Sequence, residues 1–460
     1  MRERGDAAER MTIATIQLND ETIVAVSTPP GRGGIGIVRL SGARAREIAD
    51  RQLRLRRALV HGQARFAEVL DAESGERLDE AVVTYFAGPN SYTGEDVVEI
   101  AAHGAPVLLE HLLRQCCVAG ARLAEPGEFT RRAFLSGRID LTQAEAVHDL
   151  IEAGTLHQAR IAAQQLGGSL ARLVAPVKAE LIALIAALEA GIDFAEDDVD
   201  VMATEQIIAR LAAVEAPLRE LSRSFAYGRV VREGFTLAIV GRPNAGKSSL
   251  FNRLVLRERA IVTATPGTTR DVVTERVAIN GVPVELMDTA GLRETSDEAE
   301  SLGVAKSREA MADADIVLYV VDASAASAED AAAIGGLVGR PLIVVWNKCD
   351  LAATAWPEAV ATSALTGAGI EELRAAILGL AAGGAGWGEG SVLTNLRQQQ
   401  AVSATVVALE RARAAVGMKT PHEMVLLDVY EALSALDSLT GATTSGDILN
   451  LIFSSFCIGK

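Results

Sequence analysis

Cysteine and long apolar runs are both scarce in this chain of 460 residues. The four cysteines, Cys116, Cys117, Cys349 and Cys457, include no CxxC pair. That pattern excludes a disulfide framework and a cysteine-rich zinc site, and it favours a reducing, cytoplasmic location. The apolar segment 181–188 is flanked by glutamates, so it is too short to span a bilayer. We therefore expect a cytoplasmic protein without a membrane span.

A surplus of basic residues is also missing, because 44 Lys and Arg stand against 60 Asp and Glu, a formal net charge of −16. Coating nucleic acid without specificity needs a dense basic surface, so that class is excluded, although a local basic patch is not. Between positions 44 and 65 the sequence has seven arginines and only two acids. Between positions 189 and 200 it has six acids and no basic residue. Both runs fit solvated helix faces. The basic run equally fits a weak, salt-sensitive RNA contact.

The composition is that of a folded protein with several domains, since 49% of the residues are hydrophobic and 23% are charged. At about 100–200 residues per domain, two to four domains are expected. Up to about residue 135, short apolar runs alternate with turn signals, which is typical of an α+β module. We expect a helix over Pro106–Val118 and strands over residues 22–27, 36–40, 81–86 and 96–103.

From about Gly137 the apolar residues recur at three- and four-residue spacing, which predicts helices over 179–192 and 204–224. At Phe235, β-branched runs return and alternate with helical segments, which predicts a mostly parallel sheet with helices on both faces. These runs cover residues 235–240, 284–288, 314–323 and 341–350. The Gly/Ala-rich segment 381–390 fits a linker, and the helical pattern resumes after it.

The strongest local signal is GRPNAGKS at residues 241–248, which matches G-x-x-x-x-G-K-[ST] between a predicted strand and a helix-compatible segment. Glycine lets the backbone wrap closely around phosphates, and the N–H groups at the helix start point at them. Lys247 is placed for the β- and γ-phosphates, and Ser248 is placed for Mg²⁺. The loop residues that we expect at a nucleotide are Asn244, Ala245, Gly246, Lys247, Ser248 and Ser249.

Further motifs follow in the order that guanine-nucleotide enzymes require. In DTAG, residues 288–291, the Asp288 carboxylate can hold a metal-bound water and the Gly291 N–H can sense a γ-phosphate. In NKCD, Asp350 can accept two hydrogen bonds from the N1–H and N2 amino groups of guanine, which adenine cannot offer. Thr269 can complete the Mg²⁺ shell. The ordered set resembles a guanine-specific GTPase. Its remaining expected residues are Thr268, Thr289, Ala290, Asn347, Lys348, Ser363, Ala364 and Leu365.

Leu292 follows DTAG where Ras-like GTPases carry the glutamine that orients the attacking water. Leucine cannot do this, so another residue must position the water, and something must supply positive charge at the transition state. The local candidates for the water are Glu294, Asp297, Glu298 and Glu300. The alternative interpretation, a solvated acidic loop, is the one that spacing alone favours.

The N-terminal part carries weaker signals. GRGGIG at residues 31–36 matches G-x-G-x-x-G, but prolines precede it and a strand-like run follows, so we reject a dinucleotide site. A glycine-rich turn with close backbone approach remains possible there. His103 could act as a base, although a lone histidine is more often structural. Each of five charged residues fits a surface charge or an ion pair: Arg39, Glu99, Arg131, Arg132 and Arg138.

Several longer strings carry a more specific signal: TPPGRGGIGIVRLSG, GPNSYTGEDVVEI, EPGEFTRRAFLSGRIDLTQAEAV, GRPNAGKSSLFN, TPGTTRDV, DTAGLRE and the terminal IFSSFCIGK. Together they resemble the MnmE (TrmE) family of tRNA modification GTPases. The resemblance runs from about Glu21 to Lys460. It includes N-terminal and C-terminal strings that other GTPases lack, and this makes it specific.

The resemblance implies a multidomain fold of α/β and α parts. We expect an N-terminal α+β domain over 1–135 that is similar to folate-dependent one-carbon transferases and forms a homodimer. A discontinuous helical domain over 136–231 and 383–460 would surround an inserted Ras-like P-loop GTPase domain over 232–382. The expected ligands of a 5-formyl-tetrahydrofolate or a related folate are Arg39, Glu99, Arg138 and Lys460. The family often has lysine where Arg138 stands, and the two cations differ in hydrogen-bond geometry.

The resemblance also implies a GTPase that is activated by K⁺-dependent dimerisation. Asn244 would bind K⁺, and a loop would complete its shell with Thr263, Thr265 and Thr268, of which Thr263 and Thr268 would also contact GTP. Glu300 would position the attacking water. Arg270 and Asp271 would act in closure of the switch loops.

With a flavoprotein partner, MnmG (GidA), the family adds an aminomethyl or carboxymethylaminomethyl group to C5 of the wobble uridine of certain tRNAs, using carbon from a folate. The alternative is an RNA-binding ribosome-assembly or regulatory GTPase without its own modification chemistry. The folate-type strings, and the lack of a KH-type GXXG loop, favour the first. We expect Cys457 to be a buried apolar residue beside Phe456, because only Lys460 could lower its pKa.

Overall fold

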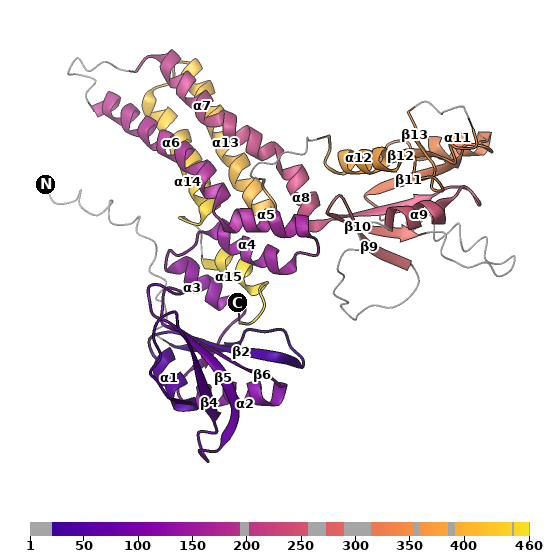
Figure 1. Ribbon diagram of the computed structural model, residues 1–460. Helices are drawn as coiled ribbons and strands as arrows, with labels where there is room; N and C mark the ends of the chain where they lie inside the picture. Colours follow the sequence, from indigo (N-terminus) through magenta and orange to yellow (C-terminus); the bar gives the residue numbers. More distant parts are fainter. Residues whose placement is uncertain are drawn as a thin grey trace. The chain divides into compact units, whose positions relative to one another are not determined.

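The computed structural model describes residues 21–193, 202–255, 273–288, 314–352, 358–384, 392–443 and 446–459. The chain divides into two compact units, which Figure 1 draws with the secondary-structure labels used below. The first unit joins the N-terminal part, up to His148, to the C-terminal part from Asp437. The second unit comprises residues 149–436. The four-part division expected from the sequence remains a prediction.

The first unit is built on a seven-stranded sheet of order β3-β4-β5-β6-β2-β1-β7. Its neighbouring strands are antiparallel except β1 and β7. The strands are β1 Ile23–Val26, β2 Gly33–Ser41, β3 Leu53–Leu55, β4 Ala64–Leu70, β5 Arg77–Phe86, β6 Val97–Gly104 and β7 Arg122–Leu123. The four predicted strands are confirmed, whereas β3, β4 and β7 were not expected from the pattern.

Helices cover both faces of this sheet, and the alternation of side chains along β1 reflects this. Val24 faces the main core, which lies under α1 (Ala45–Gln52) and α2 (Pro106–Val118). Ile23 packs instead with Phe129 of α3 (Glu128–Leu135). The bounds of α2 are those predicted from the sequence.

Four of the seven arginines between residues 44 and 65 form ion pairs with acids in the described structure. Arg44 and Arg51 both contact Glu47, at 3.0 and 2.6 Å. Arg54 reaches Glu68 of β4 at 3.0 Å. The side chains of these arginines are 47–62% exposed. The run therefore has the character of a solvated, ion-paired surface, one of the two interpretations that its composition allows.

The chain's last helix belongs to the first unit. Helix α15 (Gly446–Ser454) packs on α3. Phe453 and Phe456 form a small core with residues of α4 (Leu141–Glu152). Beyond the helix, Ile458 makes an antiparallel bridge with Pro126. The C-terminal segment is thus joined to the N-terminal sheet by helix packing and by backbone pairing.

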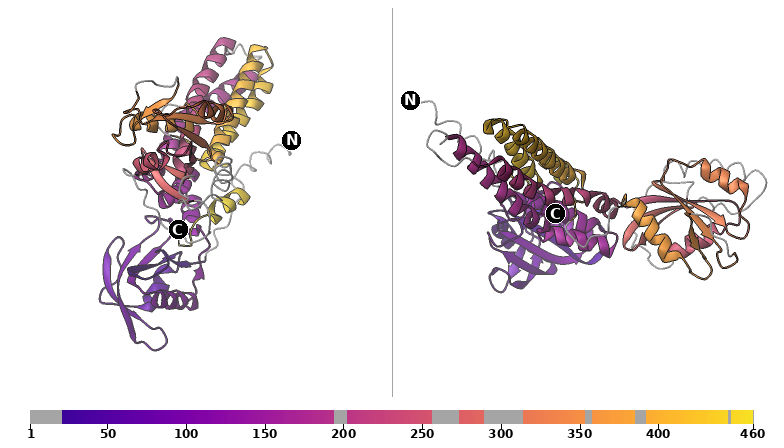
Figure 2. Two further views of the ribbon diagram at one scale, coloured as in Figure 1. Left: turned by 90° about the vertical axis from the view of Figure 1, so that its right-hand side faces the viewer. Right: turned by 90° about the horizontal axis from the view of Figure 1, so that it is seen from above.

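The second unit contains a bundle of long helices in which segments from both halves of the chain lie side by side (Figure 1 and Figure 2). Helix α13 packs along α7, and Gln165 donates a hydrogen bond to the carbonyl oxygen of Val392 at 2.8 Å. The two helical halves therefore pack together, as expected from the sequence. The helices are α5 Leu156–Leu166, α6 Ser169–Asp193, α7 Thr204–Arg223, α8 Phe225–Glu233, α13 Leu396–Gly417 and α14 His422–Thr440.

The rest of the second unit is a six-stranded sheet of order β13-β12-β11-β8-β10-β9, parallel except for the pair β9 and β10. Leu250 of α9 and Leu373 of α12 lie in the core on one face, and Leu337, after α11, packs on the other. The predicted mostly parallel sheet with two covered faces is confirmed. The elements are β8 Phe235–Val240, α9 Lys247–Val255, β9 Val273–Ile279, β10 Val282–Asp288, β11 Ile316–Asp322, α11 Ala328–Gly335, β12 Leu342–Asn347, β13 Val360–Thr362 and α12 Ile370–Ala381.

Helices long and apolar enough to cross a lipid bilayer do not occur in the part of the chain that the structure describes.

Alanine substitutions at two glycines of similar backbone conformation can test whether the packing of the C-terminal helix constrains the fold. Gly127 has φ +66°, and an added Cβ would lie 2.6 Å from the carbonyl oxygen of Phe453. Gly137 has φ +72° and an open space around an added Cβ. Both alanine variants should lose about 1–2 kcal/mol from the left-handed backbone. Gly127→Ala should lose roughly 1–3 kcal/mol more, because the two segments must separate.

Urea unfolding of the full chain measures this difference, and limited proteolysis after residue 440 reports whether the helix is released. Equal losses for Gly127→Ala and Gly137→Ala would mean that the contact with Phe453 does not constrain the fold.

Candidate functional site

The parallel strands of the second unit end at one edge of their sheet, where ligands bind in folds of this type. Strand β8 ends at Val240, directly before the 241–248 loop, and β10 ends at Asp288. Strand β12 ends at Asn347, and β13 ends directly before Ser363. The fold therefore gathers at one edge the motifs that the sequence spreads over more than 120 residues.

The 241–248 loop is shaped by glycines at close contacts. Gly241 has φ +145°, and an added Cβ would lie 2.2 Å from the carbonyl oxygen of Val320. Gly246 has φ +91°, and an added Cβ would lie 2.3 Å from Nδ2 of Asn347. Nζ of Lys247 donates to the carbonyl oxygens of Gly241 and Arg242 at 2.9 and 2.8 Å. The loop thus encloses the ammonium group, and Ser248 and Ser249 are exposed at the start of α9.

Asn347 ties two loops of this edge together. It is 1% exposed. Its Nδ2 donates to the carbonyl oxygen of Ala245 at 2.9 Å, and its Oδ1 accepts from the backbone N–H of Ala364 at 3.1 Å. A buried amide with both ends bonded fixes the distance between its partners. The loop of residues 363–365 is therefore held at a set distance from the phosphate-type loop.

Lys348 and Asp350 have different environments. Nζ of Lys348 donates to the carbonyl oxygen of Asn244 at 2.8 Å and to Oδ2 of Asp322 at 2.6 Å. Asp350 is exposed, so its carboxylate can face a base, and Leu365 is 83% exposed beside the buried Ser363. Asp322 was not predicted as a site residue. The available signal was its position at the carboxyl end of a parallel strand.

The charge of Asp322 is set by opposing effects. Burial raises the pKa of this carboxyl group, whereas hydrogen bonds from Lys348 and Ser324 lower it. The net result is a pKa below its ordinary value of 3.8. Asp322 therefore stays ionised and keeps the Lys348 ammonium group directed across the loop.

Many predicted residues of this edge lie outside the described residues. The backbone of Asp288 is placed at the end of β10. Nothing tests the roles expected for Thr263, Thr265, Thr268, Thr269, Arg270, Asp271, Thr289, Ala290, Gly291, Leu292 and Glu300, nor the water-positioning candidates Glu294, Asp297 and Glu298.

A second cluster lies in the first unit. Arg39 of β2 and Glu99 of β6 are cross-strand partners, and Nη2 of Arg39 lies 2.7 Å from Oε1 of Glu99. Nη1 of Arg39 donates to the carbonyl oxygen of Gly459 at 3.3 Å, and Oγ of Ser27 donates to the same oxygen at 3.0 Å. The guanidinium lies 5.6 Å from the ring centre of Phe129. The structure thus brings the chain's end, one residue before Lys460, to the predicted Arg39–Glu99 pair. Lys460 itself lies outside the described residues.

The loop between β5 and β6 links this pair to Arg138. An added Cβ on Gly94 would lie 3.7 Å from Cγ of Arg138. Tyr92 is 37% exposed, and its hydroxyl lies 3.0 Å from Oγ1 of Thr130. Burial raises the pKa of Tyr92, while the hydrogen bond with Thr130 and the charge of Arg39 partly offset this. Tyr92 therefore lies within the field of Arg39, and Arg138 borders the same loop two residues further on.

The remaining predictions of the N-terminal part have clear outcomes. The dinucleotide interpretation is correctly rejected, because residues 33–41 form β2 and an added Cβ on Gly36 would lie 2.4 Å from Leu109. Nδ1 of His103 lies 2.7 Å from Asp79, and its side chain is 72% exposed, which agrees with a structural role. Arg131 lies 3.5 Å from Glu125, whereas Arg132 is buried in ion pairs.

Cys457 requires a correction, since it is exposed and not buried. The two phenylalanines of this segment, Phe453 and Phe456, take the core positions, and the chain then leaves the helix with Cys457 on the outside. Cys116 shows the opposite environment, because burial raises the pKa of its thiol to about 12.

Known protein families match this chain over most of its length. A family model for the MnmE helical domain matches residues 141–457, and a model for the GTP-binding protein TrmE N-terminus matches residues 22–138. A tRNA modification GTPase MnmE from Koribacter versatilis is 59% identical over 96% of this chain and 99% of its own length. The protein of the same name from Aquifex aeolicus is 44% identical over 96% of this chain and 100% of its own length.

The chain belongs to the MnmE (TrmE) family of GTPases. The family resemblance expected from the sequence strings is confirmed, as is the multidomain fold of α/β and α parts. Among solved structures, the G domain of the FeoB iron transporter of T. maritima is 26% identical, over 32% of this chain and 98% of its own length, with a TM-score of 0.25. The match to MnmE proteins, in contrast, includes both units.

The Asp322–Lys348 pair leads to a prediction about pH. The folded-state pKa of Asp322 is lowered, so the pair's stabilisation is complete above pH 3.8 and is lost as the pH falls through that lowered value. Asp322→Asn should melt at a lower temperature than the unaltered chain at pH 7, and the difference should shrink below pH 3.8. Thermal unfolding from pH 7 to pH 3 measures this.

Lys348→Met removes the other member of the pair, and its melting temperature should show the same pH-dependent loss as that of Asp322→Asn. A difference in melting temperature that is constant over this pH range would contradict the assignment of the pair.

Proposed function

We propose that this chain hydrolyses GTP as part of a tRNA modification reaction. With the flavoprotein partner MnmG, it would add an aminomethyl or carboxymethylaminomethyl group to C5 of the wobble uridine of certain tRNAs. The proposal rests on two features that occur together in this member of the MnmE family. One is the sheet edge with the motifs expected for a nucleotide, and the other is the Arg39–Glu99 pair beside the C-terminal segment.

The sheet edge has the parts that GTP and Mg²⁺ require. The loop N–H groups and Lys247 would hold the β- and γ-phosphates, and Ser248 and Thr269 would hold Mg²⁺. Asp350 would read the N1–H and N2 amino groups of guanine. The bond from Asn347 to the carbonyl oxygen of Ala245 supports this assignment, because it keeps the base loop and the phosphate loop in register.

The Arg39 cluster has the parts that a folate requires. The carboxylates of a folate can accept hydrogen bonds from guanidinium groups, and the N–H groups of its pterin ring can donate to a carboxylate. Arg39, Glu99, Arg138 and Lys460 would make these contacts. When bound, 5-formyl-tetrahydrofolate would supply the one-carbon unit. The carbonyl oxygen of Gly459 on Arg39 supports the inclusion of the C-terminal residue.

Hydrolysis without a glutamine at Leu292 requires other groups. In our proposal Glu300 orients the water, and K⁺ replaces the missing positive charge. Asn244 would bind K⁺, with Thr263, Thr265 and Thr268. Asn244 has φ +63° in the phosphate-type loop, where its exposed side chain is free of the core. Two such domains would meet in the active state, and the N-terminal units would form the homodimer.

The cation mechanism predicts that GTP turnover is roughly tenfold or more faster in KCl than in NaCl of equal ionic strength, because in our proposal K⁺ takes the charge-stabilising role. Asn244→Ala should turn over equally slowly in both salts. Glu300→Ala should abolish turnover and keep its affinity for a fluorescent GTP analogue. Equal rates of the unaltered chain in the two salts would exclude the mechanism.

The function as a whole is tested by nucleoside analysis of tRNA from a strain that lacks this gene. The modified wobble uridines should disappear and return with the unaltered chain, but return with neither Lys247→Ala nor Arg39→Ala. Unchanged wobble uridines together with retained GTP hydrolysis would instead favour a ribosome-assembly or regulatory GTPase.

A further inference from the structure

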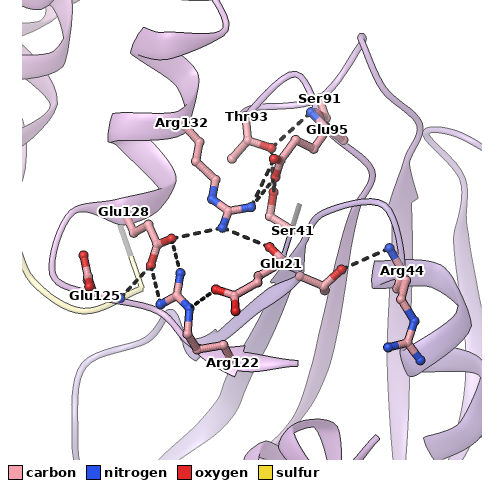
Figure 3. Close-up of polar contacts among 11 residues, drawn as sticks. Glu21, Ser41, Arg44, Ser91, Thr93, Glu95, Arg122, Glu125, Glu128 and Arg132 are labelled. Carbon is pink, nitrogen blue, oxygen red and sulfur yellow. Dashed lines mark hydrogen bonds and ion pairs between the residues drawn. The ribbon is translucent and has the colours of Figure 1, made fainter. Parts of the chain in front are cut away.

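An ion network centred on helix α3 lies in the first unit (Figure 3). At its centre is Arg132 of α3, whose side chain is 4% exposed. Nη1 of Arg132 donates to both carboxylate oxygens of Glu95, at 3.0 and 2.9 Å. Nη2 donates to Oε1 of Glu128 and to the carbonyl oxygen of Glu21, both at 3.0 Å. One guanidinium group therefore joins three segments of the chain.

Glu128 anchors the other side of this network. Its side chain is 2% exposed. It accepts from both Nη atoms of Arg122, at 3.1 and 2.7 Å, and from the backbone N–H of Glu125 at 2.8 Å. Burial raises the pKa of Glu128, but these bonds and the one from Arg132 outweigh it, so the pKa is lowered and the group is charged. A buried charge that is matched in this way resists movement of its partners.

Glu95 belongs to the loop between β5 and β6, and further bonds fix that loop. Oε2 of Glu95 accepts from Oγ of Ser41 at 2.7 Å, and the same hydroxyl lies 2.7 Å from Oγ1 of Thr93. Oγ of Ser91 donates to the carbonyl oxygen of Glu95. The network therefore holds residues 91–95, the loop that carries Tyr92 and Gly94.

Helix α3 contacts the Arg39 cluster through Phe129 and Thr130, which precede Arg132 in the helix. Phe129 lies beneath the Arg39 guanidinium, and Thr130 bonds the Tyr92 hydroxyl. Ser136, after the helix, would meet an added Cβ on Gly94 at 3.0 Å. A shift of α3 would thus move Phe129 and Thr130 together, and a shift of the loop would move Tyr92.

We propose that Arg132 and Glu95 are positioning residues of the folate site: their ion pair locks helix α3 to the 91–95 loop and so sets the places of Tyr92 and Gly94 beside Arg39 and Arg138. This inference rests on the proposed folate function. The side chain of Arg132 is 4% exposed and bonded to Glu95, Glu128 and Glu21, so it acts through these groups. Lysine cannot replace it, because a single ammonium group cannot bond Glu95 through two oxygens and reach Glu128 and Glu21 at once.

The test measures binding of 5-formyl-tetrahydrofolate to the full chain by calorimetry. Arg132→Lys and Glu95→Gln should each weaken binding roughly tenfold, as displaced supporting groups do. Affinity for GTP and the rate of its hydrolysis should not change. The matched control is Arg131→Lys, the neighbouring arginine, whose guanidinium lies 3.5 Å from Glu125, and it should bind as the unaltered chain does.

Tyr92→Phe keeps every buried charge and removes only the bond to Thr130, so it decides the matter if Arg132→Lys fails to fold. It should weaken folate binding without lowering the melting temperature. In the double variant Tyr92→Phe/Arg132→Lys, the fold-loss of folate affinity should be smaller than the product of the two single losses, because both substitutions loosen the same loop.

The outcomes separate the two proposals. If the unaltered chain binds folate and Arg39→Ala does not, but Arg132→Lys, Glu95→Gln and Tyr92→Phe bind normally, the positioning role is wrong and the folate site stands. If the unaltered chain does not bind folate at all, the proposed folate function is wrong and the positioning role falls with it.

Discussion

The close approach of two backbone segments, at Gly127 and Gly459, is the constraint on which the first unit depends. An added Cβ on Gly459 would lie 2.4 Å from the carbonyl oxygen of Val26, and one on Gly127 would lie 2.6 Å from that of Phe453. Only glycine permits both contacts, and each residue has a positive φ. The segment that ends at Gly459 is therefore packed against strand β1, and the carbonyl oxygen of Gly459 reaches Arg39.

The two candidate sites are stabilised in the same way although they lie in different units. In each, glycines let segments approach closely, and one buried polar side chain then ties the segments together. Asn347 does this at the sheet edge with a neutral amide, and Arg132 does it behind the Arg39 cluster with a charge. An amide bonded at both ends and a fully matched guanidinium share a property: moving either partner leaves a buried polar group unsatisfied.

The sequence was sufficient where the information is contiguous. The GRPNAGKS loop, the helix Pro106–Val118 and the mostly parallel character of the second sheet could be predicted from local spacing. Contacts between distant segments could not. Arg132 and Glu95 are 37 residues apart, and no periodicity pairs them. The exposure of Cys457 depends on which neighbours fill the core, and Phe453 and Phe456 fill it. Strands β3 and β4 were missed because their residues alternate only weakly in polarity.

The arginines of the first unit also explain why counting charges along the sequence is a poor measure of surface potential. The run from 44 to 65 has a surplus of positive charge, yet Arg54 finds its acid on another strand, at Glu68. Such exposed pairs contribute about 0–1 kcal/mol each, so they can exchange a carboxylate for a phosphate at little cost. Arg132 cannot exchange its partner in this way, because it is 4% exposed and its partner Glu128 is 2% exposed. An RNA contact on this unit would therefore have to use the exposed arginines, in competition with their own carboxylates, and it would weaken with added salt.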